Sequence, residues 1–295
     1  MGPHHPECPD RLHAVLHALD AAEFAPLPRL IAPEATVEQL TRVHPPNYVE
    51  ALLAIRPELG ELVALDGDTS MGEGSAQAAL HAAGAGILAV DAVMRGQVRS
   101  AFAAVRPPGH HAEPLRPMGF CLFNNAAIAA LHARVQWGLQ RVAVVDFDVH
   151  HGNGTQAMFE SDAGLFYASS HQSPCYPGTG QVWEQGVAHN IVNAPLRPGD
   201  GTMAFRAAWE RTILPALEAF APELLIISAG FDAHRDDPLA QLRVETADYA
   251  RLTDQLVALA DRCCGGRVVS MLEGGYDLNA LAASVTVHVR SLMRA

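Results

Sequence analysis

Short apolar runs alternate with longer Ala- and Leu-rich segments along most of the chain. The apolar runs lie at 101–105, 142–148, 165–170, 224–230 and 268–272, and the segments with helical spacing lie at 75–94, 124–136, 203–220, 247–262 and 278–292. Such runs are typical of strands buried on both faces of a sheet. The alternation predicts an α/β fold in which a central, mostly parallel sheet is flanked by helices on both faces. Ligands bind such sheets at the carboxyl ends of the strands.

The composition is that of a folded protein of enzyme size. The chain has 295 residues, of which 49 % are hydrophobic and 18 % are charged. This balance excludes an intrinsically disordered chain. No linker of biased composition divides the sequence, so we expect a single domain over residues 1–295. The formal net charge of −12 argues against a nucleic-acid partner.

The cysteines and the N-terminal residues bear on the cellular compartment. The five cysteines are Cys8, Cys121, Cys175, Cys263 and Cys264. Their number is odd and they form no CxxC pair, which argues against a disulfide scaffold and against a Cys-rich zinc site. The first residues contain no apolar signal segment, and the apolar runs are short or interrupted. We therefore predict a cytoplasmic protein with no membrane partner, and the sequence leaves the oligomeric state open.

Four of the predicted strands are followed by unusual polar clusters. These clusters are RPPGHH (106–111), VHHGNG (149–154), FDAHRDDP (231–238) and EGGYD (273–277). A single cluster of this kind could be an ordinary surface loop, since loops are polar. Four clusters at strand ends meet at one edge of a parallel sheet, and this indicates a functional site.

One of these clusters has the residue types of a metal site. Asp146, Asp148 and His150 alternate with apolar residues, so an extended chain places them on one side. Asp148 and His150, joined by Asp232, form a set of two carboxylates and one imidazole with coordination positions left open. Catalytic zinc requires such an open position, and these ligand types would also allow another divalent metal such as iron or cobalt. Solvated loop carboxylates are the alternative, but uncompensated carboxylates at a buried strand end are costly.

A zinc ion with two anionic ligands acidifies water weakly, so the reaction needs a general base. His110 and His111 follow a neighbouring predicted strand. We expect Asp146 to orient and charge one of them, and Asn153 to bond the other without raising its pKa as strongly. The pair would then titrate apart, although two structural histidines are the alternative. Tyr276 follows two glycines and could polarise a carbonyl. The alternative is an ordinary core tyrosine beside a Gly-Gly turn.

The clusters, in this order, resemble the zinc-dependent histone deacetylase and acetylpolyamine amidohydrolase superfamily, which has the arginase–deacetylase fold. The resemblance runs from HPECPDRL (5–12) to LEGGYDL (272–278) and includes RPPGHHAEPLRPMGF, VVDFDVHHGNGTQ and YPGTG. It implies that Asp148, His150 and Asp232 bind zinc, that His110 and His111 are the catalytic pair, and that Tyr276 polarises the carbonyl. The sequence RPPGHHA and the asparagine at position 153 resemble those of class II deacetylases more than those of class I, in which an aspartate is usual at that position. This resemblance implies that His111 is the general base.

The resemblance also implies a narrow substrate tunnel. Phe120 and Tyr176 would form its aromatic walls, Leu239 its apolar rim, and Gly119 would let the backbone approach the substrate stem. Core packing is the alternative for Phe120 and Leu239. The implied substrate is acetyl-lysine or a similar acetylated alkyl amine. Polyamine-selective relatives can carry an acid in place of Leu239, but the negative net charge keeps a polyamine substrate open.

Further implications of the resemblance concern monovalent cations and the N-terminal region. The resemblance implies one potassium ion near Asp146, Asp148, His150 and Ser169, and a second against backbone carbonyls around Phe159, Asp162 and Leu165. Arg11 resembles an arginine near the family's acetate-release channel, and a surface salt bridge is the alternative. The family has a strand upstream of the first motif, so we expect an edge strand and part of the rim loop to be missing.

Two other functions are weaker interpretations of the same residues. A ureohydrolase of the related arginase fold would need a second set of metal ligands, but Asp232 is followed by Ala233 and His234. A non-catalytic protein that binds a metal and an acylated ligand would be expected to lack Tyr276 or the histidine pair. The motifs GxSxG, GxGxxG and GxxxxGK[ST] are absent, which argues against serine-hydrolase and nucleotide chemistry. A zinc-dependent deacetylase is the preferred prediction.

Overall fold

The computed structural model describes residue 2 and residues 5–294, and residues 1, 3, 4 and 295 of the predicted domain lie outside this part. The strands are β1 (Val63–Ala64), β2 (Ser70–Met71), β3 (Ser100–Ala103), β4 (Val142–Asp146), β5 (Leu165–Gln172), β6 (Ile191–Leu196), β7 (Leu224–Ala229) and β8 (Val268–Leu272). The helices are α1 (Pro9–Ala18), η1 (Ala22–Phe24), α2 (Val37–Leu40), α3 (Pro46–Ala54), α4 (Ser75–Met94), α5 (Asn125–Trp137), α6 (Asn153–Phe159), α7 (Thr202–Ala208), η2 (Trp209–Ile213), α8 (Leu214–Phe220), α9 (Thr246–Cys264) and α10 (Leu278–Leu292).

The central sheet has six strands in the order β3-β8-β7-β4-β5-β6, and every neighbouring pair is parallel. Strands β4, β5, β7 and β8 are buried at every position, which explains the nearly continuous apolar sequences of β4, β7 and β8. The second half of β5, residues 169–172, is polar although it is buried. The predicted α/β class with a central sheet is therefore confirmed, and the sheet is wholly parallel. The short strands β1 and β2 form a separate antiparallel hairpin.

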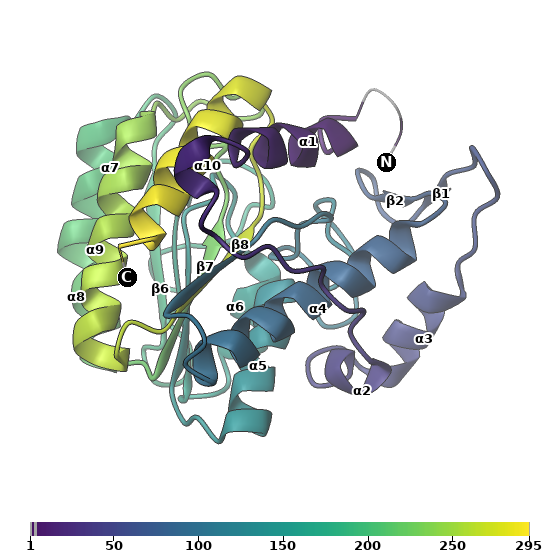
Figure 1. Ribbon diagram of the computed structural model, residues 1–295, viewed down its shortest axis with the longest axis horizontal. Helices are drawn as coiled ribbons and strands as arrows, with labels where there is room; N and C mark the ends of the chain where they lie inside the picture. The colour runs from purple at the N-terminus through teal and green to yellow at the C-terminus, as the bar shows by residue number, and fades with distance from the viewer. Residues whose placement is uncertain (1, 3–4, 295) are drawn as a thin grey trace.

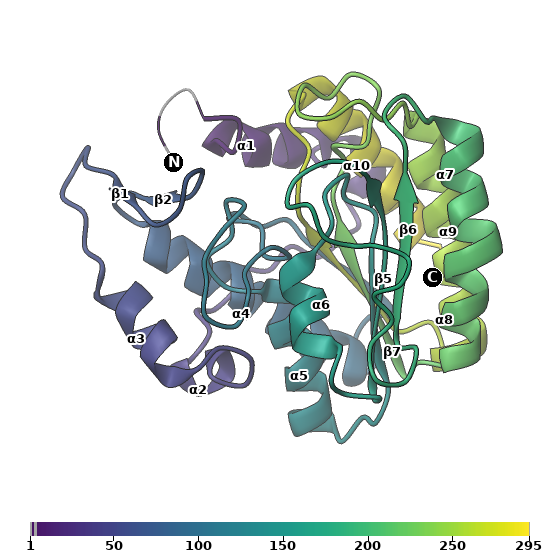
Figure 2. The same ribbon diagram turned by 180° about the vertical axis from the view of Figure 1, so that it is seen from behind.

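Helices cover both faces of the sheet (Figures 1 and 2). Apolar side chains of α1, α7, α9 and α10 pack on one face together with residues of β4 and β7. On the other face, α4 and α5 contribute mainly alanines, and these small side chains let the helices lie close to the sheet. A third apolar cluster joins α2 and α3 to α4 beside the main body.

Helix α4 is long and apolar enough to cross a membrane, judged by length and composition alone. However, 61 % of its apolar window is buried inside the protein. It packs mainly against α5 and β3. This burial is typical of a core helix in a globular fold.

Several elements differ from the sequence-based predictions, which did not include helices α1, α2, α3 and α6 or the β1–β2 hairpin. Strand β6 was not predicted, because Asn193 and Pro195 interrupt its apolar pattern; proline is tolerated there because β6 is an edge strand. The helix predicted over 203–220 is divided by the π-helical turn η2. Pro215 lies in the first turn of α8, where it cannot donate a hydrogen bond to the preceding turn.

The order of the strands determines where a ligand can bind. The chain leaves β4 toward β5 and leaves β7 toward β8, which lies on the opposite side. Since β4 and β7 are neighbours, their connections diverge and open a crevice at their carboxyl ends. This crevice is where the clusters after β4 and β7 come together.

Candidate active site

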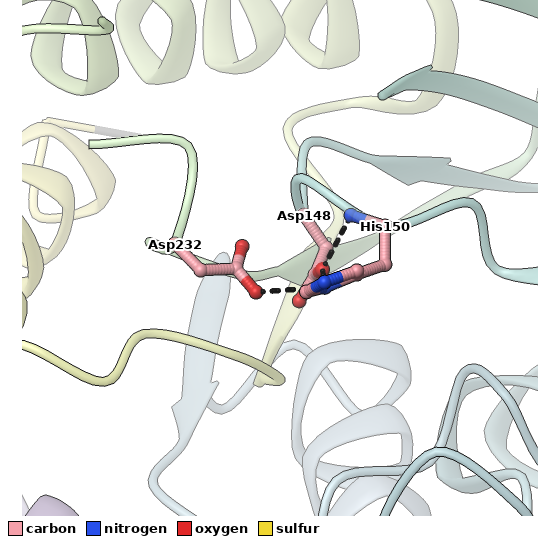
Figure 3. A group of neighbouring side chains, drawn as sticks. All are labelled: Asp148, His150 and Asp232. Atoms are coloured by element: carbon pink, nitrogen blue, oxygen red, sulfur yellow. Dashed lines mark hydrogen bonds and ion pairs between the residues drawn. The ribbon is translucent and has the colours of Figure 1, made fainter. Parts of the chain in front are cut away.

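Asp148, His150 and Asp232 converge in the crevice between β4 and β7 (Figure 3). Their ligand atoms all lie within 4.8 Å of one another, and the three residues are buried. His150 Nδ1 is 3.1 Å from Asp148 Oδ1 and 3.2 Å from Asp232 Oδ2. In the described part of the chain, this is the only group of three or more such side chains. The three predicted ligands are thus brought together from two strand ends.

Backbone amides hold both carboxylates in place. The amide of Val149 donates to Asp232 Oδ1 at 2.8 Å, and that of Gly274 donates to Asp148 Oδ2 at 2.8 Å. Each carboxylate keeps a second oxygen turned toward His150. Such outer hydrogen bonds orient metal ligands.

The charges of the group fit a divalent cation. Burial and the neighbouring charge of Asp148 raise the pKa of Asp232 to about 7. Burial opposes protonation of His150, but hydrogen bonds to Asp148 and Asp232 raise its pKa well above the ordinary value. In the absence of a metal, a proton on His150 therefore offsets only part of the negative charge that Asp148 and Asp232 can carry. A divalent cation would take over this compensation, and the donor set leaves coordination positions open.

Glycines form a tight cradle around the carboxylates. A Cβ atom at Gly274 would lie 2.2 Å from Asp232 Oδ2 and 2.6 Å from Asp148 Oδ2, and one at Gly230 would lie 2.1 Å from Asp148 Oδ2. Real Cβ atoms do not approach oxygen this closely, so any side chain there displaces a carboxylate. The ligand geometry depends on both glycines.

We expect Gly274→Ala to lower bound divalent metal at least tenfold, because the added methyl group displaces Asp232 or Asp148 from the ligand cluster. Metal content per folded chain, measured after dialysis, tests this. Gly67→Ala is the matched control, since a Cβ atom there meets nothing within 4 Å. Equal metal content in the two variants would contradict the proposed cradle.

The two adjacent histidines have different partners, as predicted. His110 Nδ1 lies 2.9 Å from Asp146 Oδ2, and His111 Nδ1 lies 2.8 Å from Asn153 Oδ1. Burial lowers the pKa of His110, but the charges of Asp148 and Asp146 raise it more, to about 10. Burial and the positive charge of His110 hold the pKa of His111 well below the ordinary value. The structure therefore decides which histidine is charged and which stays neutral.

Glu273 supports the histidine pair and was not among the predicted site residues. Its Oε2 accepts hydrogen bonds from the backbone amides of Gly109 at 2.7 Å and His110 at 3.2 Å, while Ser228 Oγ donates to Oε1. Burial raises the pKa of Glu273 to about 7. The sequence did contain a signal for this role, because Glu273 comes directly after an apolar run that predicts a buried strand. A carboxylate at the end of a buried strand needs specific hydrogen-bond partners.

A cavity of about 230 Å³ lies next to the metal-type cluster. It is lined by Asp68, His111, Gly119, Phe120, His150, Tyr176, Leu239 and Tyr276. The four predicted tunnel residues therefore lie together with one histidine of the pair and with Tyr276. Phe120 and Leu239 are only partly buried, so full core packing does not describe them. Asp68, from the β1–β2 hairpin, was missed because that hairpin is far from the motifs in the sequence.

The turn at Gly119 and Phe120 shapes one wall of the cavity. Both residues have positive φ, 56° and 69°. The turn is held by the hairpin, since the amide of Gly119 donates to Asp68 Oδ1 and that of Phe120 to Thr69 Oγ1. A Cβ atom at Gly119 would lie 2.3 Å from His111 Cδ2, so only glycine lets the backbone pass the histidine.

Arg11 is buried, and the predicted alternative of a surface salt bridge is wrong. Its guanidinium donates to the carbonyl oxygens of Gly275 and Glu273 and pairs with Glu7 at 3.2 Å. The guanidinium carbon also lies 4.8 Å from the ring centre of Tyr276. Arg11 thus ties the N-terminal helix to the segment that carries Tyr276, because a buried cation needs several partners.

Other polar residues near the cluster have their own partners. His234 Nε2 lies 3.1 Å from Thr246 Oγ1, so it is turned to the start of α9 rather than to Asp232. The amide of Tyr276 donates to Asp237 Oδ2 at 2.7 Å. All five cysteines are free.

Fold and site together define an α/β protein with a candidate metal centre at the switch point of a parallel sheet. The sequence model of the histone deacetylase domain matches residues 5–292. Histone deacetylase 14, chloroplastic, of Arabidopsis thaliana is 42 % identical over 308 residues, which cover 98 % of this chain and 73 % of that protein. Polyamine deacetylase HDAC10 of Homo sapiens is 41 % identical over 312 residues, which cover 98 % of this chain and 45 % of that protein.

A solved structure agrees with these relatives. The crystal structure of the HDA15 HD domain matches with a TM-score of 0.92 and 41 % identity, over 98 % of this chain and 82 % of that one. The chain therefore belongs to the histone deacetylase family and has the arginase–deacetylase fold. Membership supports a deacetylase function, that is, a hydrolase acting on acetylated amines.

Proposed function

We propose that the protein is a zinc-dependent amidohydrolase that removes the acetyl group from acetyl-lysine or a similar alkyl amine. This proposal rests on one observation: His111, His150 and Tyr276 line the same cavity as the aromatic side chains of Phe120 and Tyr176. We expect an extended alkyl stem to pass between Phe120 and Tyr176, which both line this cavity, and its amide would then lie beside the metal-type cluster. Zinc suits two carboxylates and one imidazole with open positions. When bound, it would polarise the amide carbonyl and acidify a water molecule.

The side chains divide the proton transfers between them. His111, kept neutral by burial and by the charge of His110, accepts a proton from the attacking water. Tyr276 hydrogen-bonds the carbonyl oxygen as negative charge develops on it. A protonated histidine of the pair then donates to the departing nitrogen. The C–N bond breaks, and acetate and the free amine are released.

Asp146 and Asn153 position the two histidines for these roles. Asp146 is itself held by the hydroxyl of Tyr167, which donates to Oδ2 at 3.0 Å. The neutral amide of Asn153 orients His111 without adding a negative charge. We also propose a monovalent cation, potassium, near Asp146, Asp148, His150 and Ser169, where two buried carboxylates favour positive charge.

The rim favours acetyl-lysine over acetylated polyamines, because apolar Leu239 offers no partner to a second ammonium group. Acetylated polyamines are the second candidate substrates, because one relative is named polyamine deacetylase. The acidic residue Asp68 in the cavity wall also favours a substrate with a second positive charge. Initial rates on acetyl-lysine peptides, acetylated polyamines and longer acyl-lysines, at equal concentrations, test the proposal. Hydrolysis of none of these by metal-loaded protein would refute it.

Leu239→Glu is expected to shift the ratio of kcat/KM toward acetylated polyamines by about tenfold, because a half-exposed carboxylate pairs with the distal ammonium for about 1 kcal/mol or slightly more. Leu239→Gln is the matched control, with a similar size and no charge, and should leave the ratio within about twofold. An unchanged ratio in Leu239→Glu would show that position 239 does not face the substrate stem.

A further inference from the structure

Three backbone carbonyl oxygens converge on the side chain of Asn190, which precedes β6 and is 2 % exposed. Asn190 Nδ2 donates to the carbonyl oxygens of Phe159 at 2.9 Å, Asp162 at 3.1 Å and Leu165 at 2.8 Å. These are the carbonyls expected from the resemblance to bind a second potassium ion. The side-chain nitrogen of Asn190 thus lies at the position where the resemblance implies a potassium ion.

A hydrogen bond to the side-chain oxygen of Asn190 determines the orientation of its amide group. Oδ1 accepts a hydrogen bond from the backbone amide of Ala188 at 3.2 Å. Nδ2 therefore faces the three carbonyls with its two protons, and an amide nitrogen has no capacity to ligate a cation. A cation at the centre of the three oxygens would collide with Nδ2.

The carbonyl oxygens have little capacity left. Phe159 O also accepts from the amide of Asp162, and Asp162 O from the amide of Leu165, both at 3.0 Å. A carbonyl oxygen has two lone pairs, so these two acceptors are saturated. The residues therefore do not fit the cation that the resemblance implies.

The charge around this loop also disfavours a cation. The carboxylate of Asp162 is paired with the guanidinium of Arg134 through Oδ2, and its Oδ1 accepts from the amide of Gly164 at 2.8 Å. The negative charge of the loop is thus already compensated by an arginine. A second positive ion beside Arg134 would be repelled.

We propose that the Asn190 amide takes the place of the second monovalent cation, so that neutral hydrogen bonds alone hold the α6–β5 loop to β6. The loop then needs no potassium to keep its conformation. This leaves at most the first site, near Ser169, to respond to monovalent cations.

Crystals grown with thallium(I) in place of potassium test the proposal directly on the unaltered protein. We expect no anomalous peak within coordination distance of the carbonyls of Phe159, Asp162 and Leu165. A peak there, with the Asn190 side chain turned away, would overturn the proposal.

Asn190→Asp provides the complementary test in solution. Its carboxylate would face three carbonyl oxygens without a donor, so we expect the cage to recruit a cation. The Tm in potassium chloride should exceed that in choline chloride of equal ionic strength by about 5 °C more than for the unaltered protein. Asn190→Leu, of similar volume but without an oxygen, should show no such added difference. Equal potassium effects in Asn190→Asp and Asn190→Leu would contradict the proposal.

Discussion

Asp232→Asn is expected to abolish metal-dependent stabilisation and to lower kcat/KM by at least a hundredfold. The amide provides a much weaker ligand than the carboxylate, and a bound metal contributes several kcal/mol to stabilising the transition state. For the unaltered protein, zinc at about a thousand times its Kd is expected to stabilise the fold by about 4 kcal/mol, which corresponds to a Tm rise of about 10 °C. Thermal unfolding with and without zinc, beside hydrolysis rates, measures both effects.

Asp236→Asn is the matched control for this experiment. Asp236 lies four residues further along the same loop, and its side chain is 63 % exposed. Its Tm and its zinc response should match those of the unaltered protein. A zinc-induced Tm rise retained in full by Asp232→Asn would contradict the proposed ligand set.

The metal-free protein should also show a pH signature of Asp232. Its folded pKa of about 7 lies above the unfolded value, so its favourable contribution is complete below about pH 4 and is lost as the pH rises through 7. Removing the titrating group in Asp232→Asn should therefore flatten the stability profile of the metal-free protein between pH 4 and 7. Chemical denaturation at each pH measures this slope.

His111→Ala is expected to lower kcat by about 10²- to 10⁴-fold, because the general base is lost while the metal ligands remain. Burial and the charge of His110 keep the pKa of His111 below 6.5. The base is therefore active above that pKa, and in the unaltered protein the acidic limb of kcat/KM should lie below pH 6.5. A pH–rate profile on an acetyl-lysine peptide checks both points.

His13→Ala is the control, since the His13 side chain is 74 % exposed on α1. Its rate and pH profile should be unchanged. Bound zinc measured in His111→Ala separates loss of the base from loss of the metal. Activity within tenfold of the unaltered protein in His111→Ala would assign the base to another group.

The predicted strands agree with the observed ones to within two residues at most ends, because a strand buried on both faces is visible as a local apolar run. The convergence of Asp148, His150 and Asp232 could be predicted for a related reason. In a parallel sheet the carboxyl ends of all strands share one edge, so polar residues directly after strands are neighbours wherever those strands lie. Strand β6 has no continuous apolar run, because its position at the edge of the sheet tolerates a proline that interrupts the pattern.

The remaining features depend on contacts between distant parts of the chain. Arg11 bonds the carbonyl of Gly275, 264 residues away, and its burial could not be read from the motif around it. Asp68 reaches the cavity only because its hairpin folds over the turn at Gly119. The side chain of Asn190 bonds the carbonyl oxygens at which the family resemblance implies a cation.

The sequence alone thus determined the fold class, the edge of the sheet that carries the site and the residue types available for chemistry. Local periodicity and the geometry of parallel strands are sufficient for these conclusions. Only the tertiary structure decided which histidine is paired with Asp146, that Glu273 holds the histidine turn, and that an amide occupies the second cation position. These depend on hydrogen bonds between residues far apart in the chain, whose partners are chosen by packing rather than by local pattern.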